Sequence, residues 1–288
     1  MTKYTVLFTA ALMLFISCSS DDNNSAPDDN GDNSETPTEL KIHKLNTDYY
    51  YNGTLDYSEE IIFDENGKIT RINGFNGRYT LNTYNAQNNL VEIGFYSNTN
   101  ELYGTHTYEY NSSNKLIKFT DNISSGNGLL TTLFSYNGNE INLFQEETDK
   151  EGKLIFNSKN LLIENSWNSS PNTIYKEIII YDSEENVSEI KVYSNSDYQY
   201  SSTFNFDDKI NPLSNDFKSN PLNYFTKDLF NIEFDGYSNY FSDANTTQKT
   251  RNNTVYTKSI QYNQDNYPVS ATILKNGELR EEQTFIYY

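Results

Sequence analysis

The chain has 288 residues, 25 of them tyrosine and 17 phenylalanine, and its formal net charge at pH 7 is −19. Such a negative protein repels phosphate backbones, which argues against a nucleic-acid partner. Aromatic residues combined with abundant Asn, Ser and Thr are typical of strands and tight turns, and no long stretch has the apolar spacing of a helix. The composition therefore predicts an all-β protein.

Residues 1–17 have the pattern of a secretory signal peptide. Lys3 precedes a short apolar stretch, and Ser17 stands just before Cys18, the single cysteine of the chain. The stretch is too short for a permanent membrane-spanning helix. The segment resembles the signal of bacterial lipoproteins, which implies that Cys18 becomes the mature N-terminus and carries lipid. The alternative is an ordinary secretory signal with an incidental cysteine.

Residues 18–38 are predicted to form a disordered acidic tether, because they contain no apolar residue beyond Ala26 to offset the entropy of ordering. The spacing before Gly31 does not fit a calcium-binding EF-hand loop, since Ala26 occupies a ligand position. The start of the tether, Ser19 to Asp22, is similar to the export signal of Bacteroidetes-type surface lipoproteins. This similarity implies an outer-membrane protein displayed on the cell surface, with the periplasmic face as the alternative.

Residues 39–288 are predicted to form one domain built on a recurring pattern. In each copy an aromatic residue is followed by Asn or Asp, a short polar turn, an aliphatic residue and another apolar residue three positions on. Because Asn, Asp and Gly favour turns between strands, each copy is predicted to be a β-hairpin. Full copies are Phe63–Ile72, Tyr84–Ile93, Tyr110–Phe119 and Tyr181–Ile190, and shortened or altered copies are Tyr136–Ile141, Phe206–Ile210 and Tyr262–Val269.

Neighbouring hairpins must cover one another's apolar faces, since a single hairpin is only marginally stable. The repeats therefore predict an antiparallel meander of hairpins that forms one large curved or wound sheet, with its closure left open. We expect residues 65–67, 112–114 and 183–185 to be turns. The segment Pro212–Asp243 breaks the rhythm, and Asn220–Phe230 is expected to form a short helical or irregular insertion.

The motif of Tyr, Asn or Asp, two variable residues, Gly or Asn, one further residue and Leu is represented by Tyr110–Leu116. It resembles the tyrosine–aspartate (YD) repeats of Rhs-type surface proteins. It is also similar to the YD-like repeats of Bacteroidetes lipoproteins of unknown function, over most of residues 45–288. The resemblance implies a repeat-built surface protein, although the chain is too short for a shell that encloses a toxin.

Residues with catalytic or metal-binding potential are few. The two histidines, His43 and His106, are expected on strands, and neither has a second histidine at metal-site spacing. The sequence contains no nucleophile elbow and no glycine-rich phosphate loop that opens a helix. We therefore predict no catalytic residue, no metal, no cofactor and no enzymatic activity.

Acidic doublets are the remaining candidates for glycoside hydrolysis, which needs two carboxylates flanking one bond. Adjacent residues of a strand point to opposite faces, so a doublet makes a poor catalytic pair. A glycoside hydrolase is accordingly the least favoured alternative. The doublets are Glu59–Glu60, Glu146–Glu147, Asp207–Asp208 and Glu281–Glu282.

Aromatic residues outside the regular repeat offer a candidate ligand platform for sugar rings: Trp167, Tyr198, Tyr200, Tyr237 and Tyr240. The alternative is that these side chains only form cross-strand pairs, the structural role predicted for the repeat aromatics. The sequence thus favours a lipid-anchored, non-enzymatic protein that binds a glycan or an envelope protein through a sheet surface. The other interpretation is a structural or accessory envelope lipoprotein without a small-molecule site.

Overall fold

A computed structural model describes residues 40–123, 128–170, 173–214 and 242–288. These residues form strands joined by short turns, and the 3-10 helix η1 (Phe75–Gly77) is a single short exception among them. The prediction of an all-β, nearly helix-free protein is therefore confirmed. The strands are β1 (Ile42–Tyr51), β2 (Thr54–Phe63), β3 (Ile69–Asn73), β4 (Tyr79–Tyr84), β5 (Leu90–Tyr96), β6 (Leu102–Tyr110), β7 (Leu116–Asp121), β8 (Leu130–Asn137), β9 (Glu140–Gln145), β10 (Lys150–Phe156), β11 (Leu162–Ser170), β12 (Thr173–Tyr181), β13 (Val187–Ser194), β14 (Asp197–Ile210), β15 (Ala244–Arg251), β16 (Thr254–Tyr262), β17 (Pro268–Lys275) and β18 (Glu278–Tyr287).

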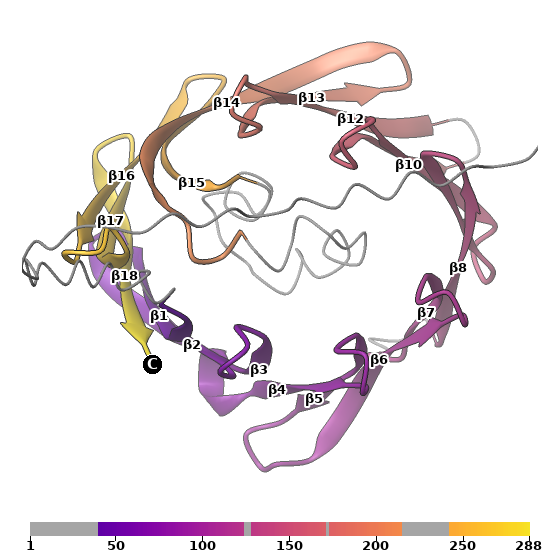
Figure 1. The fold of residues 1–288 in the computed structure, drawn as a ribbon, viewed down its shortest axis with the longest axis horizontal. Coiled ribbons are helices and arrows are strands. Elements are labelled where there is room, and N and C mark those ends of the chain that lie inside the picture. Colours follow the sequence, from indigo (N-terminus) through magenta and orange to yellow (C-terminus); the bar gives the residue numbers. More distant parts are fainter. Residues whose placement is uncertain (1–39, 124–127, 171–172, 215–241) are drawn as a thin grey trace, which may run out of the picture. The chain divides into compact units, whose positions relative to one another are not determined.

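The sheet is an antiparallel meander that closes on itself. Each strand pairs with its neighbours in the chain, as β2 does with β1 and β3. The last strand also pairs with the first, with Leu45 opposite Phe285 and Tyr49 opposite Glu281. Figure 1 shows the resulting ring of strands. The predicted meander is confirmed, but the sheet is a closed barrel rather than an open curved one.

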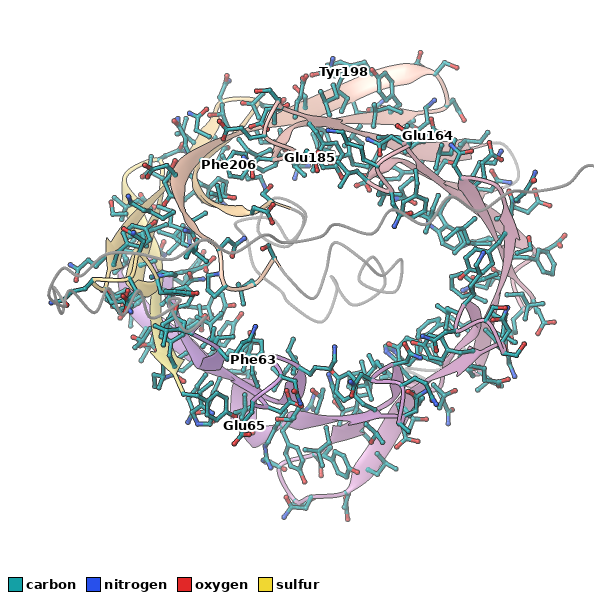
Figure 2. All side chains as sticks on the ribbon, viewed as in Figure 1. Phe63, Glu65, Glu164, Glu185, Tyr198 and Phe206 are labelled. Atoms are coloured by element: carbon teal, nitrogen blue, oxygen red, sulfur yellow. The ribbon has the colours of Figure 1, made fainter. Side chains whose placement is uncertain are left out.

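The two faces of the barrel wall differ in burial. In β1, Leu45, Thr47 and Tyr49 are buried, and the alternate residues Asn46 and Asp48 are more exposed. This alternation is that of a strand with one covered face. The buried face points inward: Figure 2 shows Phe63 toward the inside of the ring and Tyr198 at its outer rim. Buried apolar side chains from most strands form one core cluster along this inward face.

The recurring motif has the same local structure in successive copies. The aromatic residue pairs with the aliphatic residue six positions later, as Tyr110 does with Leu116, and the register shifts just before the aromatic. This shift is a bulge with one extra residue in the outgoing strand, and it brings both side chains of the pair to one face. Further pairs of this kind are Phe63–Ile69, Tyr84–Leu90, Tyr96–Leu102, Phe156–Leu162, Tyr181–Val187 and Tyr262–Pro268.

The polar residue after each aromatic holds the turn. Asn111 Oδ1 accepts hydrogen bonds from the N–H groups of Ser113 (2.9 Å) and Lys115 (3.0 Å). Asn114 has a φ of 63°, a left-handed conformation in which Asn is among the least strained residues. The turns predicted at 65–67, 112–114 and 183–185 all lie between strands, so these predictions are confirmed.

The turn predicted at Phe206–Ile210 is not found. The altered copy Phe206–Ile210 does not turn the chain, because β14 continues to Ile210 and the turn follows at residues 211–214. Asn211 supplies the side-chain acceptor there, in the role that Asp207 was expected to fill. The insertion expected at Asn220–Phe230 lies outside the described residues, as do the signal peptide and the tether.

Candidate functional site

The hydroxyl groups of the repeat tyrosines are engaged within the sheet. Five of them donate a hydrogen bond to a backbone carbonyl at the aliphatic position of the preceding repeat, whereas Tyr262 donates to the carboxylate of Asp207. Burial raises the pKa of Tyr110 well above its usual value, so the hydroxyl stays protonated and donates. These bonds support the predicted structural role of the repeat aromatics. The donor–acceptor pairs are Tyr84–Ile69 (2.8 Å), Tyr110–Leu90 (2.9 Å), Tyr136–Leu116 (2.8 Å), Tyr181–Leu162 (2.9 Å) and Tyr287–Pro268 (2.7 Å).

The turns that follow β4, β6, β8 and β10 line a groove of about 730 Å³ at one end of the barrel, which we call the asparagine groove. Connections from even-numbered to odd-numbered strands share this end because the strands alternate in direction. The rings of Tyr110, Tyr136 and Phe156 form its apolar part. Its amide-bearing lining consists of Asn88, Asn89, Asn114, Asn139, Asn157, Asn160 and Gln87.

Hydrogen bonds fix part of this lining and leave part exposed. The side chains of Asn89 and Asn114 bond to each other across two neighbouring turns. Asn139 Nδ2 donates to the carbonyl of Phe156 (2.7 Å). Asn88 and Asn160 have φ angles of 62°, which the turn requires. Their side-chain amides make no hydrogen bond to another described residue, so each offers a donor and an acceptor to a ligand.

The described lining of the asparagine groove carries lysine and no carboxylate, in contrast to the acidic composition of the chain. Lys68 and Lys115 line it, and no Asp or Glu is among the described residues of its lining. The ammonium group of Lys115 lies 4.7 Å from the centre of the Tyr136 ring, and that of Lys68 lies 5.8 Å from the Tyr84 ring. The groove therefore combines neutral amides, aromatic rings and two cations.

The predicted aromatic platform is divided between the two faces of the wall. Trp167 and Tyr200 are half-buried and packed against the inward core. The Trp167 ring covers Gly152, where a Cβ atom would come within 2.7 Å of it. The guanidinium of Arg251 lies 3.8 Å from the centre of the Tyr200 ring.

Tyr198, by contrast, lies on the outward face and is 56% exposed (Figure 2). Its ring meets that of Tyr193 edge-on at 5.9 Å. Tyr237 and Tyr240 lie outside the described residues. The described members of the platform therefore do not form one continuous flat surface.

Two of the acidic doublets, Glu59–Glu60 and Glu281–Glu282, are split as strand geometry predicts, whereas Glu146–Glu147 lies in the turn between β9 and β10. Glu59 faces inward, where burial raises its pKa to about 7. Glu60 faces outward and pairs with Lys44 at 2.6 Å, a hydrogen bond that lowers its pKa despite partial burial. Glu281 is fully buried, whereas Glu282 is exposed and accepts a hydrogen bond from Tyr50. Neither doublet presents two carboxylates to one point.

His106 faces inward between aromatic rings. Its ring centre is 4.8 Å from that of Phe95 and 5.0 Å from that of Phe119. Burial lowers its pKa, and the nearby Asp121, 3.3 Å from Nε2, only partly offsets that effect. His43 instead contacts the ring of Tyr288 at 4.5 Å. In the described ranges, no three His, Cys, Asp or Glu side chains gather as a metal site would require.

The outward face of the wall is charged around the barrel. Lysine and glutamate side chains form ion pairs on it, mostly across neighbouring strands. Such pairs are typical of a surface in contact with water. The pairs are Lys44–Glu60 (2.6 Å), Lys118–Glu109 (2.9 Å), Lys153–Glu140 (3.3 Å), Lys176–Glu164 (3.6 Å) and Lys191–Glu189 (3.3 Å).

A second groove of about 800 Å³ lies over β7 to β12, mainly on the outward face. Its apolar lining includes Ile117, Leu133, Phe144 and Ile174, and charged residues such as Glu151 border it. We call it the outer-wall groove. The described ranges also contain no helix with the length and apolar character of a membrane span.

Comparisons with known proteins find only distant structural similarities. No protein-family model matches the chain, and no curated protein matches its sequence. A porin-like protein from Bacteroides vulgatus ATCC 8482 is 12% identical over 87% of this chain and 99% of the other, with a TM-score of 0.41. A porin-like protein from Bacteroides uniformis ATCC 8492 is also 12% identical, over 86% and 96%, with a TM-score of 0.32. The TcdB2-TccC3 protein without its hypervariable C-terminal region is 12% identical over 81% of this chain and 14% of its own length, with a TM-score of 0.31.

Sequence reasoning did not identify the asparagine groove. The sequence predicts the turns that contain these asparagines, but it does not indicate which turns become neighbours in the barrel. The available signal was the succession of turns at 85–89, 111–115 and 157–161, which all contain Asn and no acidic residue in an acidic chain, with a lysine in the last two.

Proposed function

We propose that the mature protein is a non-enzymatic glycan-binding lipoprotein, anchored through Cys18 to the outer membrane and displayed on the cell surface. The asparagine groove is its binding site. The observation that carries this proposal is the lining of that groove, in which unengaged amides stand beside aromatic rings. A sugar hydroxyl both donates and accepts hydrogen bonds, as an amide does, and its ring carbons pack on aromatic faces.

The size and position of the groove support this role. Its volume of about 730 Å³ lies within the range of small-ligand sites and accommodates a few sugar units. Its lining comes from several turns held by backbone and side-chain hydrogen bonds, such as those to Asn157. A site held in this way costs little ordering entropy on binding.

The charged outward face supports attachment through lipid rather than through the barrel wall. A barrel wall in contact with lipid tails carries an outward apolar band. Here, ion pairs such as Lys118–Glu109 and Lys176–Glu164 occupy the outward face. We therefore propose that the barrel lies in water beyond the acidic tether, with the periplasmic face of the outer membrane as the alternative location.

A structural or accessory envelope lipoprotein is the second candidate. The outer-wall groove favours it, because Phe144 and Ile174 are 37% and 48% exposed there. Exposed apolar residues with a polar border are typical of protein contacts. A glycoside hydrolase is a weaker alternative, since Glu59 and Glu60 diverge to opposite faces.

The binding proposal is tested on a glycan array with the full mature chain. We expect a defined set of glycans to bind, and Asn88→Ala together with Asn160→Ala to abolish that signal without lowering the unfolding midpoint by more than a few degrees. Lys176→Gln, on the outward face, is the control and should bind as the parent does. Absence of any bound glycan would favour the accessory role.

The anchoring proposal is tested by Cys18→Ala and cell fractionation. We expect the parent protein in the outer-membrane fraction, accessible to protease on intact cells, and the variant in soluble fractions. Unchanged membrane retention of the variant would contradict lipid attachment at Cys18.

A further inference from the structure

We infer that the asparagine groove selects glycans that carry negative charge, as carboxylate or sulfate groups. This inference deepens the proposed glycan-binding function and rests on it. The starting observation is a local reversal of charge. The chain has 40 Asp and Glu against 21 Lys and Arg, yet the described lining of the groove has two lysines and no acidic residue.

The fold does not require this reversal. Asp182 holds its turn with two hydrogen bonds of 2.9 Å, from the N–H groups of Glu184 and Asn186. Asn157 holds its turn with the same two bonds, at 2.9 and 3.0 Å, from Lys159 and Leu161. A carboxylate and an amide oxygen thus serve the turn equally. The backbone of the turn would therefore accept Asp at position 157, and the neutral Asn there is not explained by the turn.

Lys115 is placed to meet an anionic group. Its side chain is exposed, and its contact with the Tyr136 ring, at 4.7 Å, leaves the charge uncompensated. No carboxylate of the described residues lies within ion-pair distance of it. Lys118, three positions on, instead pairs with Glu109 at 2.9 Å on the outward face. The two lysines differ in partner because Lys115 lies in the turn that lines the groove, whereas Lys118 lies on the outward face of β7.

Long-range repulsion does not prevent such binding. At physiological ionic strength the Debye length is about 8 Å, so charges beyond the groove are largely screened. Within the groove, Lys115 and the amides of Asn88 and Asn160 act at contact distance. A hydrogen bond from an ammonium to a carboxylate or sulfate oxygen is about twice as strong as a neutral one. The groove therefore discriminates by contact and not by the field of the whole protein.

The test uses pairs of polysaccharides with the same backbone, one member charged and the other neutral. Polygalacturonate is compared with its fully methyl-esterified form, and dextran sulfate with dextran, by titration calorimetry on the full mature chain in 0.15 M salt. We expect at least one charged member to bind at least about tenfold more tightly than its neutral partner. Lys115→Gln should remove most of that difference, and Lys118→Gln, the matched control, should keep it.

The outcomes separate the inference from the function on which it rests. Equal binding of charged and neutral partners would overturn charge selection and leave glycan binding intact. Binding of none of these four and of no array glycan would overturn the proposed function itself. A single-stranded RNA that binds with the same dependence on Lys115 would replace the glycan with a different polyanion, and this would overturn the inference.

Discussion

Two neighbouring turns, Asn157–Leu161 and Asp182–Asn186, have the same backbone and opposite charge. Each is held by a side-chain oxygen that accepts two backbone N–H groups. The first lines the asparagine groove, whereas the second contains three carboxylates, on Asp182, Glu184 and Glu185. One ion pair, Lys159–Glu185 at 2.5 Å, joins them. The repeat therefore fixes the path of the chain and leaves the charge of each turn free to vary.

The largest expected effect is a loss of stability of equal size when the repeat tyrosine is removed near the asparagine groove or near the acidic turn. Tyr110→Ala and Tyr181→Ala each remove a mostly buried ring and the hydroxyl bond to the preceding repeat. We expect each to lower the free energy of unfolding by about 3–5 kcal/mol. Urea denaturation measures both. A large loss at only one of the two positions would mean that the regions do not share one framework.

Replacement of Glu59 tests whether a negative charge on the inward face lowers the stability of the protein, in contrast to the charges in the turns. Its pKa in the folded protein is about 7, above the ordinary value of 4.5. The folded state therefore holds the proton longer than the unfolded state, and stability falls as pH rises from about 4.5 to 7. Glu59→Gln should be more stable than the parent above pH 7, by at most about 3 kcal/mol, and similar to it near pH 4.

Thermal unfolding of the parent and of Glu59→Gln between pH 4 and 8 measures this effect. Glu60→Gln is the control, since its partner is Lys44 on the outward face. A constant difference between the parent and Glu59→Gln across the range would show that the inward carboxyl is not the titrating group.

Loss of the turn acceptor has a smaller effect. Asn157→Ala and Asp182→Ala each leave two turn N–H groups without their side-chain partner. By analogy with capping residues, each should cost about 1 kcal/mol. Differential scanning calorimetry of the two variants checks this value. A clearly larger loss for one residue type would mean that Asn and Asp are not equivalent in the turn.

Exchange of Asn and Asp between the two turns should have the smallest effect on stability. It therefore tests the effect of charge on binding separately from stability. Asn157→Asp and Asp182→Asn preserve the acceptor, so each should change the free energy of unfolding by less than about 0.5 kcal/mol. Asn157→Asp places a negative charge in the asparagine groove and should weaken binding of an acidic glycan. Asp182→Asn should leave that binding unchanged. Calorimetric titration of both variants with the same acidic glycan measures this difference in binding.

The local part of the fold could be predicted from the sequence because each hairpin depends on nearby residues. The spacing from Tyr110 to Leu116 contains the bulge and the turn, and both are found where the pattern indicates them. The prediction of a hairpin turn in the altered copy at Phe206 was wrong, because Asp207 does not begin a turn. Its carboxylate accepts hydrogen bonds from Asn245 and Tyr262, and the strand continues.

The closure of the barrel and the asparagine groove could not be predicted from local patterns. Whether Leu45 pairs with Phe285 depends on the summed twist of all intervening strands, which no local pattern records. The groove depends on which turns become neighbours, such as those that carry Asn89 and Asn114. Trp167 was considered as a surface platform because the face of an irregular strand is not evident before its register is known.

The pairing of β1 with β18 has a consequence for how the protein folds. An unfinished sheet presents rows of unpaired N–H and C=O groups on its two edges, and such edges promote aggregation. Here both edges disappear only when Phe285 and its neighbours meet Leu45 and its neighbours. Contacts of such long sequence separation form slowly. The chain therefore remains exposed to edge-to-edge association until its last strand is in place, and a chaperone that shields strand edges should increase the yield of folded protein.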